Sequence, residues 1–353
     1  QWSGITIEEV KENFPEAYKT WKLEPEKLVL KDKNGFEFKP IPTLINQATD
    51  FLDRLIKQHS PENDETVLIV GHNAILRCII LKLLNQPKHG FRRIQLDNAS
   101  LSIINLIPDI EKPYQVQLEC LNSTTHLNKI LPNKVNAPRV ILVRHGETNW
   151  NLEGRFQGQI DIPLNENGKI QAAAAEKFLK ILKIDRAFSS SLTRPRQTAE
   201  TILKAHPGVK IELEEGLVEI AHGLWEGKLE SEIKAEWPEL LKTWQNHPEN
   251  VQMPEGETIQ DVWFRAIKCW RTICSKLNSE QTALVVAHDA VNKTILCHLL
   301  GLTPSDIWMV KQGNGSVTIV DIYDKPGQPD VVTCLNLTSH LGGVIDCTTA
   351  GAL

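Results

Sequence analysis

The chain has 353 residues, more than a typical single domain, so we expect about two domains. Hydrophobic residues make up 41% and charged residues 24%, and a net charge of -5 does not favour binding to nucleic acid or to an anionic membrane. The apolar runs are far shorter than the roughly 20 residues that a membrane-spanning helix needs, so we expect no membrane partner.

The cysteines indicate a reducing compartment. There are seven of them, an odd number at irregular spacings without a CxxC pair, which argues against a disulfide framework and against a structural zinc site. We therefore expect a cytoplasmic protein. Residue 1 is Gln and the only methionines are Met253 and Met309, so we expect the sequence to be part of a longer protein whose targeting signal, if any, lies outside it.

A long internal repeat is visible in the sequence. Residues 67–74 match residues 283–290, which places His72 at the position of His288, 216 residues later. Further matches continue in the same order, with Leu121-Asn122 matching Leu335-Asn336 at a spacing of 214. The sequence therefore predicts two copies of one domain.

The two copies differ in completeness. We expect an N-terminal copy (residues 1–132), which lacks any counterpart of residues 139–223 and forms the C-terminal portion of a domain. A linker (residues 133–138) containing Asn133, Asn136 and Pro138 separates it from a complete C-terminal copy (residues 139–345).

Strand and helix patterns alternate along the C-terminal copy. We expect strands at 140–143, 187–189, 283–287, 317–321 and 331–335, and helices at 165–182, 193–205, 230–244, 258–277 and 290–300. This alternation predicts an α/β domain in which a largely parallel sheet lies between helix layers.

Polar clusters follow three of the expected strands. They are Arg144-His145-Gly146, residues 189–194, and His288, and the carboxyl ends of parallel strands meet at one edge of a sheet. Arginine presents a planar set of donors that matches phosphate oxygens. Two arginines and two histidines without an acidic or cysteine cluster favour an oxyanion over a metal ion, so a phosphate group is expected here.

The order of these motifs resembles that of the histidine phosphatase superfamily, also called phosphoglycerate mutase-like. The resemblance spans residues 139 to about 341, and the repeat extends it to residues 1–127. It implies three-layer α/β/α domains with a mostly parallel sheet. The residues that carry it are Val143-Arg144-His145-Gly146-Glu147-Thr148, Trp150-Asn151, Gly158, Asp161, Leu164, Gly168, residues 189–194, Gln197-Thr198-Ala199, Glu219, residues 223–227 and Val286-Ala287-His288.

The resemblance implies a role for each of five residues. His145 would be the nucleophile that forms a phosphohistidine. Arg144, Arg194 and His288 would hold the phosphoryl oxygens. Glu219 would be the general acid that protonates the leaving alcohol and then activates water.

Three further residues match positions that bind the substrate: Asn151, Gln157 and Gly158. The resemblance implies a small phosphorylated metabolite as the partner, with no cofactor and no metal ion. The oligomeric state stays open.

Two positions near the expected site are interpreted as structural. Asp289 stands where the family commonly has glycine, and we expect it to cap the following helix, as Asn73 would in the N-terminal copy. The negative charge of Asp289 near the anion site would disfavour highly charged substrates. His222 is expected to be an ordinary exposed histidine.

The activity expected from this pattern is a metal-independent phosphatase for small phosphomonoesters. A phosphoglycerate mutase is the alternative, but mutases of this family carry a long insertion with paired arginines, whereas only 69 positions separate Glu219 from His288 here and no such pair occurs among them. A non-catalytic protein that binds a phosphorylated ligand is a second alternative. The tandem arrangement also resembles the plant and cyanobacterial group of 2-carboxy-D-arabinitol 1-phosphate phosphatases, and fold and motif do not fix the substrate.

The N-terminal copy is expected to be catalytically silent, because it has no counterpart of Arg144, His145, Arg194 or Glu219. Without the missing elements, residues 67–70 and 101–104 should lack neighbours and leave apolar side chains and strand edges open.

Overall fold

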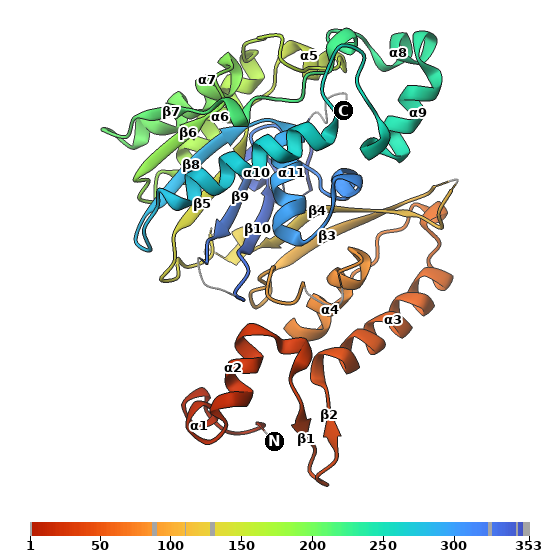
Figure 1. Ribbon diagram of the computed structural model, residues 1–353, viewed down its shortest axis with the longest axis vertical. Helices are drawn as coiled ribbons and strands as arrows, with labels where there is room; N and C mark the ends of the chain where they lie inside the picture. Colours follow the sequence, from red (N-terminus) through yellow and green to blue (C-terminus); the bar gives the residue numbers. More distant parts are fainter. Residues whose placement is uncertain are drawn as a thin grey trace.

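The computed structural model describes residues 2–86, 90–109, 111–127, 131–323, 327–343 and 345–348. Within these ranges, eight strands form one large sheet in the order β3-β4-β10-β9-β5-β8-β6-β7 (Figure 1). Their bounds are β3 Leu101–Ile107, β4 Gln115–Ser123, β5 Arg139–Arg144, β6 Arg186–Ser189, β7 Ile211–Leu213, β8 Thr282–Ala287, β9 Val317–Asp321 and β10 Val331–Leu337.

Most strands of this sheet run in the same direction. β5, β8, β6 and β7 pair in parallel, whereas β9 pairs antiparallel with β5 and the order β9-β10-β4-β3 continues antiparallel. Only β4 and β9 therefore oppose the other six described strands, and the expected α/β fold with a mostly parallel sheet is confirmed.

Helices cover both faces of the sheet. Ile141 and Val143 of β5 pack with α6 and α7, while Val140 and Leu142 face the cluster that includes α10 and α11. Because side chains alternate along a strand, the continuous apolar run of β5 buries both faces. The helix bounds are α5 Asn149–Glu153, α6 Glu166–Leu179, α7 Thr193–Ile202, α10 Ile259–Ser275 and α11 Asp289–Leu300.

The single helix expected at 230–244 is wrong. The structure has two helices there, α8 Glu230–Glu236 and α9 Pro238–Asn246, separated at Trp237. Pro238 disfavours helical backbone at the residue before it and lacks a hydrogen-bond donor, so it ends one helix and begins the next.

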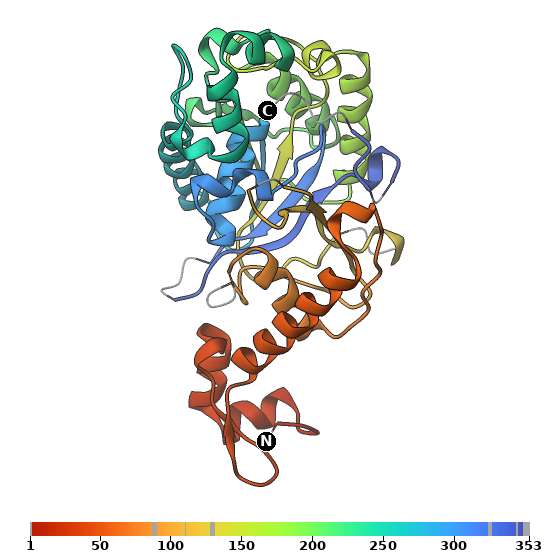
Figure 2. The same cartoon turned by 90° about the vertical axis from the view of Figure 1, so that its right-hand side faces the viewer.

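The N-terminal copy adds two strands to the large sheet and a group of elements below it, of which α3 and α4 share a hydrophobic core with the sheet (Figures 1 and 2). These elements are α1 Ile7–Asn13, α2 Pro15–Leu23, the β1 Leu30–Lys31 and β2 Glu37–Phe38 hairpin, α3 Pro40–Gln58 and α4 Asn73–Leu83. Short 3-10 helices complete the description at Pro25–Lys27, Pro61–Asn63, Thr125–Leu127, Leu203–Ala205, Glu215–Leu217, Gly223–Trp225, Pro248–Asn250, Pro304–Met309 and Ser339–Leu341.

The expected open surfaces of the N-terminal copy are present. Leu68 and Val70 are 80% and 86% exposed, and residues 64–72 form neither helix nor strand. β3 pairs with β4 on one side and has no second neighbour among the described strands. Residues 67–70 match the buried strand β8 in sequence, but without neighbouring strands they cannot form a sheet.

Residues 1–132 and 139–345 meet through β4 and β10, which pair antiparallel with Leu121 opposite Leu335. Residues 133–138 between them contain no helix or strand. In the described ranges, no helix combines the length and the apolar character that crossing a membrane requires.

Candidate active site

The site forms where β5, β8 and β6 end. The main-chain N–H of His145 donates to the Ala287 carbonyl at 3.1 Å, which continues the parallel β5–β8 pairing past the last residue of β5. This pairing brings the rings of His145 and His288 to a centroid distance of 5.1 Å, with their planes at 69°. Both histidines are buried.

The hydrogen bonds of His145 define the state of its ring. Nε of Arg194 donates to Nε2 of His145 at 3.2 Å, so Nε2 carries the lone pair. The other ring nitrogen, Nδ1, then donates to the Gly146 carbonyl at 2.7 Å. Burial, Arg194 and Arg144 hold the pKa of His145 well below its usual value, so the imidazole is neutral and its unprotonated Nε2 is the nitrogen that could act as a nucleophile.

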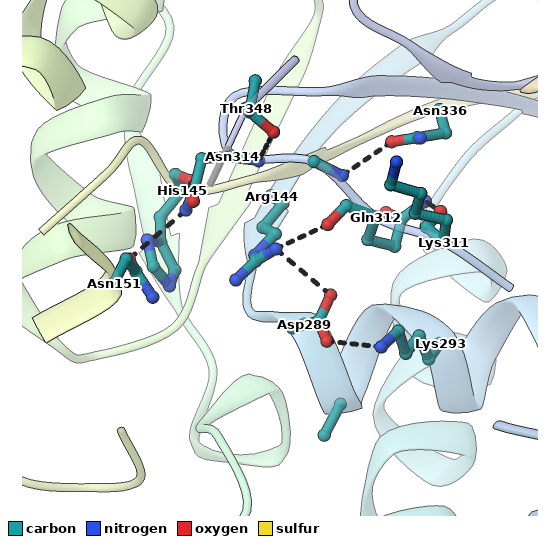
Figure 3. Close-up of polar contacts among 12 residues, drawn as sticks. Arg144, His145, Asn151, Asp289, Lys293, Lys311, Gln312, Asn314, Asn336 and Thr348 are labelled. Atoms are coloured by element: carbon teal, nitrogen blue, oxygen red, sulfur yellow. Dashed lines mark hydrogen bonds and ion pairs between the residues drawn. The ribbon is translucent and has the colours of Figure 1, made fainter. Parts of the chain in front are cut away.

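Two buried arginines flank this ring. Arg194, in the first turn of α7, donates from Nη2 to the Gly158 carbonyl at 2.7 Å and from Nη1 to the Ile160 carbonyl at 3.3 Å. Burial lowers its pKa to about 10, which leaves it charged at neutral pH. Arg144, at the end of β5, donates to the Gln312 carbonyl and lies 3.4 Å from Oδ1 of Asp289 (Figure 3).

His288 is held by a single side-chain partner. Its Nε2 lies 2.9 Å from Oγ of Ser190, which follows β6, while Nδ1 has no hydrogen-bond partner in the described part of the chain. Burial, followed by the charge of Arg194, lowers the pKa of His288 well below its usual value. The ring is therefore neutral and keeps one nitrogen available for a ligand.

Glu219 is a buried carboxyl group beside the start of α11, the helix that follows His288. Its Oε1 accepts from the N–H of Ile220 at 2.9 Å and its Oε2 from the N–H of Ala290 at 3.3 Å, in the first turn of α11. Burial and the nearby charge of Asp289 raise the pKa of Glu219. A raised pKa suits a group that must donate a proton.

The three expected substrate-binding residues also lie in this region. Oδ1 of Asn151 accepts from Nδ2 of Asn314 at 3.3 Å, and Oε1 of Gln157 accepts from Oγ1 of Thr148 at 2.9 Å. Nε2 of Gln157 is buried and has no partner among the described residues. The Gly158 carbonyl accepts from Arg194, as described above. A Cβ at Gly158 would lie 2.1 Å from Oε1 of Glu226, so the loop has room only for glycine.

Comparison with known proteins gives the family. The family model described as "Histidine phosphatase superfamily (branch 1)" matches residues 1–114 and 140–334. The chain belongs to this superfamily. The resemblance seen in the sequence is thereby confirmed.

Relatives in the superfamily match a little over half of this chain. Phosphoserine phosphatase 1 of Hydrogenobacter thermophilus is 34% identical over 204 residues, which are 58% of this chain and 94% of the relative. The 2-carboxy-D-arabinitol-1-phosphatase of Triticum aestivum is 33% identical over 207 residues, 58% of this chain. That match spans 41% of the wheat protein, less than half its length.

Solved structures of the superfamily agree with the fold. Bacillus stearothermophilus YhfR is 30% identical and has a TM-score of 0.55, over 58% of this chain and 100% of that chain. A putative alpha-ribazole-5'-P phosphatase from Escherichia coli is 26% identical with a TM-score of 0.52, over 57% of this chain and 96% of that chain.

Glu226 has a supporting role that sequence reasoning did not assign. Its carboxylate accepts from the main-chain N–H groups of Gln159, Ile160 and His222, at 2.9, 2.8 and 3.2 Å. It thereby fixes the loop whose carbonyls hold Arg194. The residue stands inside the family motif at 223–227, but its motif position alone gives no role.

The expectation for Asp289 is wrong. The N-cap of α11 is His288 and Asp289 is the first helical residue, so its side chain makes no cap and instead pairs with Arg144 and, at 2.7 Å, with Nζ of Lys293 (Figure 3). Asn73 is likewise the first residue of α4, and its side chain donates to the Leu96 carbonyl.

The expectation for His222 is also wrong, because this residue is fully buried. Its ring packs edge-on against Phe156 and Trp244. Burial lowers its pKa to about 3, so it is a neutral member of an aromatic cluster.

Proposed function

We propose that the C-terminal copy hydrolyses small phosphomonoesters through a phosphohistidine at His145, without a metal ion. One observation carries this proposal most directly: the unprotonated Nε2 of His145 receives a hydrogen bond from Arg194 in a buried site that also holds Arg144. A neutral nucleophile between fixed positive charges is suited to attack phosphorus and to stabilise the charge that develops.

The reaction proceeds in two displacements. Nε2 of His145 attacks the phosphorus while the bond to the ester oxygen breaks, and Glu219 gives its proton to the departing alcohol. The Glu219 carboxylate then takes a proton from water, whose oxygen attacks the phosphohistidine and releases inorganic phosphate. Arg144, Arg194 and His288 hold the phosphoryl oxygens in both steps.

Asn151, Gln157 and Gly158 form the substrate-binding part of the proposal. The free Nε2 of Gln157 is a buried donor, and a ligand oxygen would satisfy it. Gly158 contributes its carbonyl, which orients Arg194.

The names of relatives suggest the kind of substrate. Two of them are named for phosphoserine and for 2-carboxy-D-arabinitol 1-phosphate, both small phosphorylated acids, and we place the substrate in this class. Phosphoglycerate and ribazole phosphate belong in the same test panel. The compound with the highest kcat/KM identifies the substrate.

A mutase is the less supported alternative. Some relatives carry that name, including 2,3-bisphosphoglycerate-dependent phosphoglycerate mutase 2 of Gloeobacter violaceus, 32% identical over 176 residues. A mutase passes the phosphoryl group back to substrate, so the products of phosphoglycerate distinguish the two activities. Inorganic phosphate is expected, and accumulation of the isomeric phosphoglycerate would favour the mutase.

Hydrolysis of an aryl phosphate in excess chelator distinguishes an enzyme from a non-catalytic protein that binds a phosphorylated ligand. We expect turnover that chelator leaves unchanged, because arginines and histidines already supply the positive charge. Binding without turnover would support the ligand-binding alternative, and turnover that requires added Mg²⁺ would contradict the metal-independent mechanism.

We further propose that residues 1–132 are the C-terminal portion of one copy, residues 133–138 the linker and residues 139–345 a complete copy, and that residues 1–132 do no chemistry of their own within this sequence. His72 is the counterpart of His288, but the N-terminal copy has no counterpart of the proposed nucleophile. Residual turnover in a His145→Ala variant that disappears on adding His72→Ala would overturn this assignment.

A further inference from the structure

The junction between the two copies has approximate two-fold symmetry. Leu121 and Leu335 occupy the same repeat position and face each other across β4 and β10. On either side, Nδ2 of Asn122 donates to the Thr333 carbonyl at 2.6 Å, and Nδ2 of Asn336 donates to the Glu119 carbonyl at 2.7 Å. Each copy therefore presents the same surface to the other, as in a symmetric dimer.

The same two asparagines also hold equivalent loops. Oδ1 of Asn122 accepts from the N–H of Asp97 at 2.6 Å, and Oδ1 of Asn336 accepts from the N–H of Gly313 at 2.8 Å. These define two matching loops, residues 95–99 and residues 311–315. The first belongs to the copy without a counterpart of His145, and the second belongs to the copy with the site.

Loop 311–315 touches the phosphate-binding residues directly. The N–H of Gly315 donates to the carbonyls of both Arg144 and His145 at 3.1 Å, and the Gln312 carbonyl accepts from the Arg144 guanidinium. Nδ2 of Asn314 adds a hydrogen bond to the His145 carbonyl at 3.2 Å (Figure 3). The position of this loop therefore sets the position of Arg144 and His145.

A strand of the N-terminal copy holds the other side of this loop. The Leu118 carbonyl of β4 accepts from the N–H of Lys311 at 3.1 Å, and Oε2 of Glu119 lies 3.2 Å from Nζ of Lys311. The Glu119 carboxylate is buried and also accepts from Nδ2 of Asn105 at 2.8 Å and from the N–H of Asp346 at 3.0 Å.

This charged contact breaks the symmetry. In the repeat, Thr333 is the counterpart of Glu119, and Gln95 is the counterpart of Lys311. Gln95 keeps the main-chain bond, donating to the Val332 carbonyl at 3.1 Å, but it has no charge. The ion pair is therefore formed only on the side of the junction that faces the site.

We propose that β4 of the N-terminal copy positions the phosphate site of the C-terminal copy, with Glu119 and Asn336 as positioning residues that act through loop 311–315. This inference rests on the proposed function, since it assigns the N-terminal copy a part in that site. A shift of about 1 Å in a catalytic group can cost roughly 100-fold in rate, so a loosened loop has a measurable effect.

The symmetry supplies a matched pair of variants, Asn336→Gly and Asn122→Gly. Both asparagines have positive φ, 52° and 56°, so glycine fits each backbone while the two side-chain hydrogen bonds are lost. We expect similar falls in melting temperature. We expect only Asn336→Gly to raise the KM for an aryl phosphate and the inhibition constant of inorganic phosphate, by roughly tenfold or more, with Asn122→Gly near wild type. Equal effects of the two variants on phosphate affinity, or none in either, would overturn the proposal.

Glu119→Gln is a second variant that keeps the shape of the side chain, in case Asn336→Gly does not fold. It should also raise the inhibition constant of inorganic phosphate. An unchanged inhibition constant in a folded Glu119→Gln protein contradicts the inference. Calorimetric measurement of inorganic phosphate binding to the full chain distinguishes failure of this inference from failure of the proposed function. If the wild type binds phosphate without turnover, the proposed function fails, while the ratio between the matched variants still decides the inference.

Discussion

At the residue scale, burial shifts the pKa values of His145 and Glu219 in opposite directions. It lowers the pKa of His145, with help from two arginines, and it raises the pKa of Glu219, with help from Asp289. Burial thereby favours the unprotonated form of the proposed nucleophile and the protonated form of the proposed acid within one small site, which is the arrangement that this chemistry needs.

The pH profile of kcat/KM follows from these directions. Activity is lost at low pH when His145 gains a proton, and since its pKa lies well below 6.5, that loss occurs well below 6.5. Activity is lost at high pH when Glu219 loses its proton, at a pKa above 4.5. We expect a bell with its maximum on the acidic side of neutrality. A rate that rises steadily into alkaline pH would contradict both assignments.

Glu219→Gln gives a separate test of the acid. The variant should lose the alkaline limb of the profile, and it should slow esters with poor leaving groups more than nitrophenyl phosphate, whose leaving group barely needs a proton. Equal losses on both kinds of ester would remove Glu219 from this role.

Asp289→Gly probes the carboxylate next to Arg144. Without this negative charge we expect tighter binding of dianionic phosphates, and we expect the pKa of Glu219 to fall because its second-largest upward influence is gone. The alkaline limb should therefore move to lower pH, by roughly one unit or less. An Asp289→Asn variant controls for the lost side-chain volume, and a limb that stays in place in both variants would show that Asp289 does not act on Glu219.

The sequence predicted that the polar side chains following β5, β6 and β8 lie together, because the carboxyl ends of parallel strands meet at one edge of a sheet. The roles themselves stay predictions. The sequence prediction failed at one helix boundary. Aspartate is a favoured N-cap residue, but α11 begins one residue earlier than expected, at Asp289, and the Asp289 carboxylate pairs with Arg144.

At the scale of the element, the loop after Gln157 shows how a remote carboxylate supports an arginine. Glu226 accepts three main-chain N–H groups, and two of them belong to the loop whose carbonyls hold Arg194. An ionised acceptor of several N–H groups fixes a loop more firmly than neutral contacts do.

Glu226→Ala should release this loop. Because the carbonyls of the loop hold Arg194, we expect kcat/KM to fall by roughly tenfold or more. Glu236→Ala is the matched control, since Glu236 makes a surface ion pair with Lys228, whose loss costs little. Steady-state kinetics with melting curves measure both. Similar kinetics in the two variants would argue against a positioning role for Glu226.

Alternating strand and helix patterns predicted most of the longer elements between residues 139 and 337, but not the short β7 Ile211–Leu213 and α5 Asn149–Glu153. The failure at Trp237 has a local cause, the proline that follows it. Residues 67–70 show that a local pattern does not predict a strand by itself. Their apolar pattern is that of a buried strand, but no described strand pairs with them and Leu68 and Val70 are exposed.

At the scale of the whole molecule, the sheet runs through both copies. The repeat predicted two copies from sequence, but it could not predict that they join at β4 and β10, because a strand edge has no sequence signal for its partner. The junction places Glu119 of β4 beside loop 311–315, which carries Asn314, and the proposed positioning role of β4 rests on this contact.

The proposed mechanism requires that His145 becomes phosphorylated during turnover. Rapid mixing of the full chain with a phosphomonoester, quenching in alkali and peptide mass spectrometry would locate the added phosphoryl group. We expect phosphorylation of the peptide containing His145, at a rate at least as fast as turnover, and none in His145→Ala. With nitrophenyl phosphate, whose leaving group barely needs a proton, we expect more of it in Glu219→Gln, because hydrolysis of the phosphohistidine is then the slowed step. Turnover without any phosphorylated peptide, or with the phosphoryl group on another residue, would contradict it.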